Sequence, residues 1–466
     1  MSEEAIRYEA SHIQVLEGWE AIRKRPGMYV GSTGERGLHQ LVFEVAGRSV
    51  REALSGRPGP IDVTLTPDGG VRVADDGPGV PVEAAGGTEG PALEALLTSP
   101  HAGTALNSRH AVAVSLFGMG PCVTTALSSR LTAEVRREGV RWVQEYVRGV
   151  AVAPPSAAGP ATGSGTAIAF RADTDIFGTA ECSFDVLAER FRELAFLNRG
   201  LDISLTDERP PSGPRSERFW FPGGARDFVA FLEARPDVPV PPDVIGFERE
   251  DEGMQGSVEV ALRWCDAREE RVRSFANSQP TPYGGTHEAG FRDGVAAAIN
   301  AYARQRRLLA AADPDLSADR IGEGLTAVVS VKLDRPEFHG ATCGELGGAA
   351  VRACVGEAVR EHLSTWLEGH PAQATAVVER IVRGCLPGLS SNRPPRRIQG
   401  TEPAGRRPPC GARAAGQRPL AVERAERRDG SRVGPLSCRG ACRTLRSARD
   451  TAPHHARRRS RGQPSP

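Results

Sequence analysis

The chain has 466 residues, of which 39% are hydrophobic and 25% are charged, and this length can supply two or three domains with sizeable cores. No run of about 18 apolar residues occurs and the N-terminus lacks a basic-then-apolar leader, so we expect a cytoplasmic protein with no membrane partner. The formal net charge of +1 conceals an asymmetry, because residues 391–466 contain 19 arginines against five acidic residues. The nine cysteines include no C-x-x-C pair, which argues against a zinc ribbon.

Three stretches rich in proline, glycine and serine interrupt the chain, at residues 154–165, 207–217 and 234–243. The second of them separates a strand-like segment from a new apolar pattern, so it is the best candidate for a domain boundary. We therefore predict a first α/β domain over residues 1–206, a linker over 207–217 and a second α/β domain over 218–388.

Residues 389–466 are predicted to form a disordered tail. From residue 391 onward there is no phenylalanine, tryptophan or tyrosine, and arginine, proline, glycine and alanine dominate. Such a segment buries too little apolar surface to offset the entropy lost on ordering. Two interpretations stay open, a basic arm that binds nucleic acid and a shifted reading frame of GC-rich DNA.

The first chemical candidates lie on a helix that the apolar spacing predicts over residues 38–54. Four charged residues fall together on a face of that helix away from its apolar side: Glu44, Arg48, Arg51 and Glu52. Taken alone, this group is equally typical of ordinary surface ion pairs at i, i+4 spacing.

A hairpin is predicted over residues 61–81, where alternating apolar residues flank a Pro-Asp-Gly-Gly turn. The hairpin leads into Asp75, followed by Gly77 and Gly79. A carboxylate beside two glycines lets the backbone pass close to a ligand while the acid accepts hydrogen bonds, although a plain turn has the same composition.

Two further glycine-rich segments follow. Gly118 and Gly120 precede an apolar, helix-like run, and glycines before a helix N-terminus suit phosphate binding through exposed amides. Residues 163–170 then read GSGTAIAF, in which Thr166 opens a predicted strand. Each motif is weak by itself, and what distinguishes this chain is their order and spacing.

That order, a helix with a glutamate, a D-x-G-x-G step, a glycine lid and a Gly-Thr pair before a strand, resembles the GHKL ATPase superfamily. Three longer stretches, 13–45, 274–294 and 321–333, resemble the DNA gyrase B family more narrowly. The resemblance extends from about residue 6 to about residue 384. It implies a GHKL-type α/β sandwich followed by a smaller transducer domain of ribosomal-protein-like α/β fold.

The resemblance also implies roles for the matching residues. Glu44 matches the general base that activates water on the γ-phosphate of ATP. Asp75 matches the acceptor of the adenine amino group, and Thr166 supports that contact. The other nucleotide-binding positions carried over are Tyr8, Gly77, Gly79, Gly118 and Gly120.

The same resemblance implies partners. Tyr8 and Ile13 lie in an N-terminal arm that reaches a second protomer in the family, which predicts a homodimer or a heterodimer with a gyrase B. Gyrase A and DNA are implied in the same way.

The sequence departs from the family pattern where the chemistry lies. The asparagine that ligates Mg²⁺ is replaced by Arg48, whose guanidinium has no acceptor atom, so a bound Mg²⁺ is doubtful. We expect Arg48 to lower the pKa of Glu44, one turn away, and to make it a poorer base. Pro78 replaces an arginine, so we also expect Glu52 to pair with Arg48.

Other departures fall in the lid and in the transducer. Ala105 replaces the lid lysine, and Val114, Ser115 and Phe117 replace two lid glycines and a histidine. Branched side chains restrict the conformations that a phosphate cradle needs. Cys343 stands where the family has a lysine that contacts the γ-phosphate. The acidic TOPRIM segment that holds the metal for DNA cleavage is not found, so we expect this chain alone not to cleave DNA.

These observations favour a degenerate gyrase-B-like protein that binds ATP but hydrolyses Mg-ATP poorly, a form of pseudoenzyme. Two other functions stay open: a non-catalytic regulator that dimerises with a full-length gyrase B, and an active ATPase component of a type II topoisomerase. A decayed gene whose product has no function is the last alternative.

Overall fold

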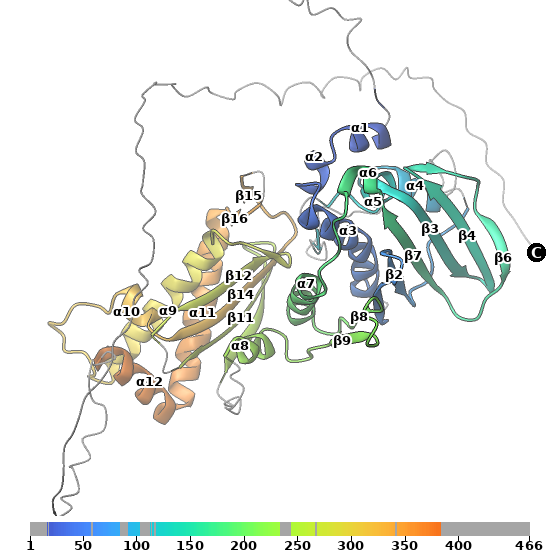
Figure 1. Ribbon diagram of the computed structural model, residues 1–466. Helices are drawn as coiled ribbons and strands as arrows, with labels where there is room; N and C mark the ends of the chain where they lie inside the picture. Colours follow the sequence, from blue (N-terminus) through green and yellow to red (C-terminus); the bar gives the residue numbers. More distant parts are fainter. Residues whose placement is uncertain are drawn as a thin grey trace, which may run out of the picture. The chain divides into compact units, whose positions relative to one another are not determined.

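The computed structural model describes seven stretches, 18–56, 59–83, 92–102, 118–233, 244–265, 268–340 and 343–383, together with residues 16, 112, 114 and 115 (Figure 1). The chain divides into two compact units, residues 1–391 and 392–466, and every described residue belongs to the first unit. The tail predicted over 389–466 lies outside the described residues.

A mixed sheet occupies the N-terminal half of the described chain. Its strands follow the order β5-β4-β3-β7-β2-β1-β8-β9, with β6 paired to β4. All of these pairs are antiparallel except β1 with β8. The strands are β1 (Ile61–Leu65), β2 (Val71–Asp75), β3 (Ser128–Arg137), β4 (Val140–Val147), β5 (Val150–Ala151), β6 (Ser156–Pro160), β7 (Gly165–Ala172), β8 (Ile203–Asp207) and β9 (Arg215–Phe219).

Helices pack on this sheet and complete the first core. The predicted helix over 38–54 is confirmed as α3 (Glu35–Leu54), whose apolar side packs on β1 and β2. The others are α1 (Gly18–Lys24), α2 (Gly27–Val30), α4 (Ala92–Thr98), α5 (Cys122–Leu127), α6 (Thr174–Phe177) and α7 (Phe184–Leu197). Leu41 and Val45 of α3 belong to the same buried cluster as Ile61, Val63 and Ile203 of the strands. The result is the expected α/β sandwich.

A second sheet follows, with the order β10-β11-β14-β12-β13. Its strands are β10 (Ile245–Asp251), β11 (Gly256–Trp264), β12 (Arg271–Ala276), β13 (Gln279–Pro280) and β14 (Leu325–Leu333). The strands β11 and β14 are buried almost throughout, as expected for strands covered on both faces.

Two long helices pack against this sheet and share its core. They are α9 (Thr286–Gln305) and α11 (Ala349–Gly369), with α8 (Ala225–Glu233), α10 (Ala318–Gly322), α12 (Pro371–Arg383) and the short ribbon of β15 (Phe338–His339) and β16 (Glu345–Leu346) completing the segment. Apolar residues of α9, α11, β11 and β14 form one buried cluster. No helix among the described residues is both long and apolar enough to span a bilayer.

The segment predicted as a linker, 207–217, differs from that expectation. It forms the end of β8, the turn and the first part of β9, because β8 pairs with β9 over the register Ile203–Phe219 to Asp207–Arg215. Burial of Phe219 in the first core secures the second strand. The prolines and glycine of 209–214 therefore mark a tight connection within the first sheet.

Candidate functional site

Helix α3 carries the charged residues that the sequence singled out, and the structure buries two of them. Glu44 is 2% exposed and Arg48 is 9% exposed, although both are charged residue types that seldom lie inside a protein. The apolar residues of α3 face the sheet, which places Glu44 and Arg48 against the end of β2 and the glycine loop before α5. The surface ion-pair interpretation therefore does not apply to these two residues.

The Glu44 carboxylate is held by the glycine loop. The amide of Met119 donates to Oε1 at 3.1 Å, and the amide of Gly120 donates to Oε2 at 2.8 Å. Burial raises the pKa of Glu44, while these amides, the hydroxyl of Ser115 and the charge of Arg51 act in the opposite direction. Glu44 thus occupies amide groups of the loop that the sequence predicts as a phosphate cradle.

The glycines of that loop have the conformations that only glycine adopts readily. Gly118 has φ +57° and Gly120 has φ +88°, both in the left-handed region. The amide of Gly118 donates to the hydroxyl of Ser115 at 3.2 Å. Ser115, which replaces a family glycine, therefore braces the loop by a hydrogen bond that glycine cannot make.

Asp75 ends β2 and is 5% exposed. Its Oδ2 accepts hydrogen bonds from the guanidinium of Arg48 and from the hydroxyl of Ser49, the latter at 2.8 Å. Its Oδ1 accepts from the amide of Gly77 at 3.1 Å. Both oxygens of the predicted adenine acceptor are therefore engaged by the protein itself.

Arg48 lies elsewhere than the sequence predicts. Its guanidinium pairs with Asp75 at the end of β2, whereas we expected pairing with Glu52 and a direct influence on Glu44. The cation that acts on Glu44 is Arg51 instead, and Glu52 acts on Arg48 only through its charge. Arg48 pairs with Asp75 because a buried guanidinium needs a buried carboxylate within hydrogen-bonding distance.

Burial leaves the two arginines under-satisfied. It lowers the pKa of the Arg48 guanidinium to about 10, with the charge of Glu52 opposing the shift and that of Arg51 adding to it. Within the described part of the chain, Nε of Arg48 and Nη2 of Arg51 are buried without a hydrogen-bond partner. Both nitrogen atoms are hydrogen-bond donors, so together they can bind a group with acceptor oxygens.

Thr166 lies directly opposite Asp75 in the pairing of β2 with β7. Its hydroxyl accepts a hydrogen bond from the amide of Val80 at 3.2 Å, which ties the strand to the D-D-G-P-G segment. Gly79 has φ +75°, and a Cβ there would lie 2.6 Å from the Arg136 carbonyl oxygen. The structure therefore brings Asp75, Gly77, Gly79 and Thr166 together.

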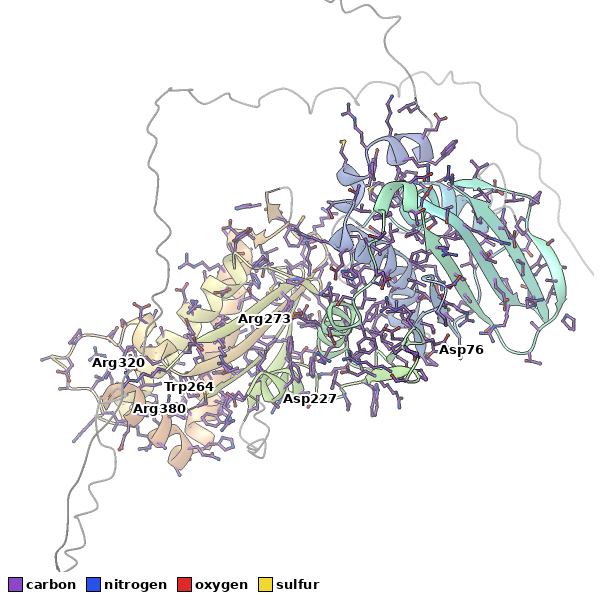
Figure 2. All side chains as sticks on the ribbon, viewed as in Figure 1. Asp76, Asp227, Trp264, Arg273, Arg320 and Arg380 are labelled. Carbon is purple, nitrogen blue, oxygen red and sulfur yellow. The ribbon has the colours of Figure 1, made fainter. Side chains whose placement is uncertain are left out.

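The second acid of the motif, Asp76, takes no part in this pocket. It is exposed, directly follows β2 and pairs with Arg136 of β3 at 2.8 Å; Asp76 is labelled in Figure 2. Cys343 also lies apart, in the connection between β15 and β16, where its amide donates to the carbonyl of Gly340. Tyr8, Ile13, Ala105 and Phe117 lie outside the described residues.

The residue types near Glu44 do not fit a divalent cation. Arg48 stands at the position of the expected ligand and offers only N–H donors, and Arg51 adds a second positive charge. Sequence reasoning missed Ser49 and Met119, which bond to Asp75 and Glu44 respectively. Their residue types carry no signal for these roles, which depend on contacts between distant segments.

Residues 224–385 match the family model for DNA gyrase B. The DNA gyrase B protein of Streptomyces coelicolor is 46% identical over 392 residues, which are 81% of this chain and 57% of that protein. The novobiocin-sensitive DNA gyrase B protein of Streptomyces niveus is 42% identical over 407 residues, 83% of this chain and 60% of that one. This chain thus spans less than two thirds of the length of these curated relatives.

Solved structures agree. The 43K ATPase domain of Thermus thermophilus gyrase B, in complex with an aminocoumarin, is similar with a TM-score of 0.66 and 33% identity, over 79% of this chain and 94% of that one. The ATP-binding domain of Francisella tularensis topoisomerase IV, in complex with a small-molecule inhibitor, has a TM-score of 0.64 and 27% identity, over 79% and 97% respectively.

Proposed function

The chain belongs to the DNA gyrase B family, and on this basis we propose that it binds an adenine nucleotide but hydrolyses Mg-ATP poorly. In this proposal the nucleotide-binding part lies in residues 1–206 and the transducer part in residues 218–388. The observation that carries it is the position of Arg48, which replaces a metal ligand and pairs with Asp75.

The groups that we assign to adenine and to the phosphates already form hydrogen bonds within the protein, which supports a weakened affinity for the nucleotide. Adenine has to share Asp75 with Arg48 and Ser49, and phosphates have to displace Glu44 from the amides of Met119 and Gly120. Each of these exchanges breaks a hydrogen bond in a poorly hydrated place, so part of the binding free energy is offset.

In this proposal the positive charges of Arg48 and Arg51 attract the phosphates of the nucleotide. Their unpartnered atoms among the described residues, Nε of Arg48 and Nη2 of Arg51, can donate to phosphate oxygens directly. Glu44 keeps a base's position on α3, and its raised pKa is typical of a group poised to accept a proton. Without a metal to neutralise the transferred phosphoryl group, transition-state stabilisation falls, and one such loss lowers a rate by about 10²–10³.

Calorimetry of an ATP analogue with the full chain, with and without Mg²⁺, tests this proposal. We expect Mg²⁺ to change the affinity by less than about tenfold, which is about 1.4 kcal/mol. Arg48→Asn, which restores the family's residue type, is expected to make the affinity depend on Mg²⁺. Strict Mg²⁺ dependence of the unchanged chain contradicts the proposal, and so does the absence of any binding at millimolar nucleotide.

An active ATPase is the second candidate, because Glu44 is buried beside the glycine loop and burial raises its pKa, as is typical of a general base. Steady-state phosphate release that Glu44→Ala abolishes supports it. Glu94→Ala is a matched control, since Glu94 lies on α4 and bonds to Gln144.

Partners are proposed from the family alone. A second gyrase-B-type chain, gyrase A and DNA are the partners to test, and a regulator of a full-length gyrase B is the alternative to a homodimer. Sedimentation of the full chain with and without nucleotide, alone and mixed with a full-length gyrase B, separates these cases.

A further inference from the structure

Arg190 of α7 contacts two segments that are far apart in the sequence. Its Nε donates to the carbonyl of Val114 at 3.3 Å, and its Nη2 donates to the carbonyl of Ser278 at 3.0 Å. Its Nη1 pairs with Glu193 at 3.3 Å, and only 13% of the side-chain area of Arg190 is exposed. A single guanidinium therefore joins the segment before the glycine loop to the second sheet.

Helix α7 is built to join the two cores. Phe191 and Leu194 belong to the first core, whereas Phe196 and Leu197 belong to a separate junction cluster. The junction cluster consists of Phe196, Leu197, Ala225, Phe228, Val229, Ala261, Phe275 and Val328, and so combines α7 and α8 with strands of the second sheet.

A second polar link lies beside the first. Glu193 pairs through Oε2 with Arg190 and through Oε1 with Arg273 of β12, which is labelled in Figure 2. Glu193 is 8% exposed, so this carboxylate is secured by two guanidinium groups from different parts of the fold. Because its charge is buried, movement of either arginine leaves part of that charge uncompensated.

The target of these links is a turn with unusual backbone conformation. Asn277 and Ser278 connect β12 to β13 with φ +49° and +65°, consecutive left-handed residues that are not glycine. Such residues persist only where their surroundings determine them strongly. Ser278 is fully buried, and its hydroxyl accepts from the side-chain amide of Asn198, directly after α7, at 3.0 Å. The turn therefore depends on α7 and its C-terminal end for its geometry.

The other end of the link lies next to the candidate base. Val114 precedes Ser115, whose hydroxyl accepts from the amide of Gly118, and the next two amides of that loop, those of Met119 and Gly120, donate to the Glu44 carboxylate. A change at Glu44 thus has a short covalent and hydrogen-bonded path to the Val114 carbonyl, and from there to Arg190.

We propose that Arg190 is a positioning residue that couples the Glu44 carboxylate and its glycine loop to the turn between β12 and β13. It acts by sharing one guanidinium between the carbonyls of Val114 and Ser278, so that displacement of one changes the hydrogen bond to the other. The coupling belongs to the protein without ligand, and it does not depend on the proposed nucleotide affinity.

A hydrogen-exchange cycle on the full chain tests the coupling, with exchange measured in peptides covering residues 274–281. Glu44→Gln perturbs one end, because the amide nitrogen of glutamine cannot accept from the loop and one of the two backbone hydrogen bonds is lost. With Arg190 present, we expect Glu44→Gln to accelerate exchange in 274–281 by about threefold or more, within the range of coupling between residues that share a network. In an Arg190→Lys background the same change is expected to have no effect there.

Arg141→Lys is the matched control. Arg141 also bonds to one carboxylate and one carbonyl, those of Glu134 and Ala158, but all three lie in the first sheet. The Glu44→Gln effect is expected to persist in that background. If Arg190 only stabilises the fold, Arg190→Lys raises exchange in 274–281 but leaves the effect of Glu44→Gln unchanged. This additive outcome overturns the proposal.

Absence of any Glu44→Gln effect in the presence of Arg190 overturns it as well. If Arg190→Lys fails to fold by circular dichroism, Glu193→Gln takes its place, since it keeps the volume and removes the charge that orients both arginines. The effect of Glu44→Gln in that background is expected to fall at least about twofold, and an unchanged effect contradicts the coupling.

Discussion

Asp75 and Arg48 form a buried pair whose stability is unlike that of the many surface pairs of this chain. Side-chain exposure is 10% for Arg48 and 5% for Asp75, whereas it is 64% for Arg130 and 42% for Glu145 in a typical surface pair. Removing one member of a buried pair leaves a charge in a poorly polarisable place, which is costly. A surface pair contributes little because water solvates both partners.

We therefore expect Arg48→Met to lower the free energy of unfolding by about 3 kcal/mol or more, measured by urea denaturation at pH 7. Arg130→Met serves as the control, with an expected change below about 1 kcal/mol. The double change Arg48→Met with Asp75→Asn is expected to cost less than the two single changes combined. Equal effects of Arg48→Met and Arg130→Met contradict the buried pair.

His287 at the start of α9 makes a pH-dependent contribution to the free energy of unfolding. It is fully buried, with Nε2 at 3.1 Å from the Thr281 hydroxyl and Nδ1 without a partner among the described residues. Burial lowers its pKa to about 4. An unfolded histidine binds a proton below about pH 6.5, so between these values the unfolded state holds more protons and acid favours unfolding.

The expected result is a free energy of unfolding that falls from about pH 6.5 toward about pH 5, with a slope contribution of at most about 1.4 kcal/mol per pH unit from this residue. Urea midpoints at about pH 7 and about pH 5 measure it. His287→Gln is expected to reduce the pH dependence relative to that of the unchanged chain. An unaltered slope in His287→Gln shows that other groups control acid sensitivity.

At the scale of elements, the contact between α9 and α11 depends on small residues. A Cβ on Gly290 would overlap the carbonyl oxygen of Arg352, and one on Gly294 would lie 2.5 Å from the carbonyl oxygen of Gly356. The helices approach each other backbone to backbone at these points. The helix-forming preference of alanine is therefore outweighed by the overlap that its methyl group creates.

Gly290→Ala is expected to lower the free energy of unfolding by about 1–3 kcal/mol, as overpacked sites do. Gly369→Ala, at the end of α11 where nothing lies within 4 Å of an added Cβ, is the control and is expected to be neutral or stabilising by up to about 1 kcal/mol. Thermal denaturation of both variants measures these changes. An unchanged stability of Gly290→Ala means that the two helices can move apart at no cost.

At the scale of the whole described chain, the junction cluster joins α7 of the first core to α8 and the second sheet. Phe196 stacks on Phe228 with ring centroids 4.7 Å apart, and Phe228 contacts Phe275 of β12 at 5.8 Å. These rings bury a continuous apolar surface between α7, α8 and the second sheet. Phe196 also stacks on Phe221 with ring centroids 3.8 Å apart, so loss of the Phe196 ring removes contacts on both of its sides.

Phe196→Ala is therefore expected to cost about 3–5 kcal/mol and to separate the unfolding of the two cores into two calorimetric transitions. Phe231, which is 46% exposed, is the control, and Phe231→Ala is expected to keep the single transition. A single, merely shifted transition in Phe196→Ala would show that other contacts keep the cores coupled.

Local pattern was sufficient for the elements that carry the site. The apolar spacing around Glu44 predicted α3, and the alternation before Asp75 predicted the β1–β2 hairpin, because both signals depend on neighbouring residues. The order of Glu44, Asp75, Gly118 and Thr166 indicated the GHKL superfamily, and the stretches 13–45, 274–294 and 321–333 indicated the DNA gyrase B family. The hairpin of β8 and β9 was mistaken for a linker, because turn residues look alike in a hairpin and in a linker.

Patterns along the chain, and the resemblance that they carry, were thus enough to predict the α/β architecture and the family, and both are confirmed. The individual bonds emerge from the folded chain alone: Arg48 to Asp75, Glu44 to the amides of Met119 and Gly120, and Arg190 to both Val114 and Ser278. This difference arises because a long charged side chain has several partners within reach. The choice among them depends on burial and on distant backbone groups, and neither is encoded in local spacing.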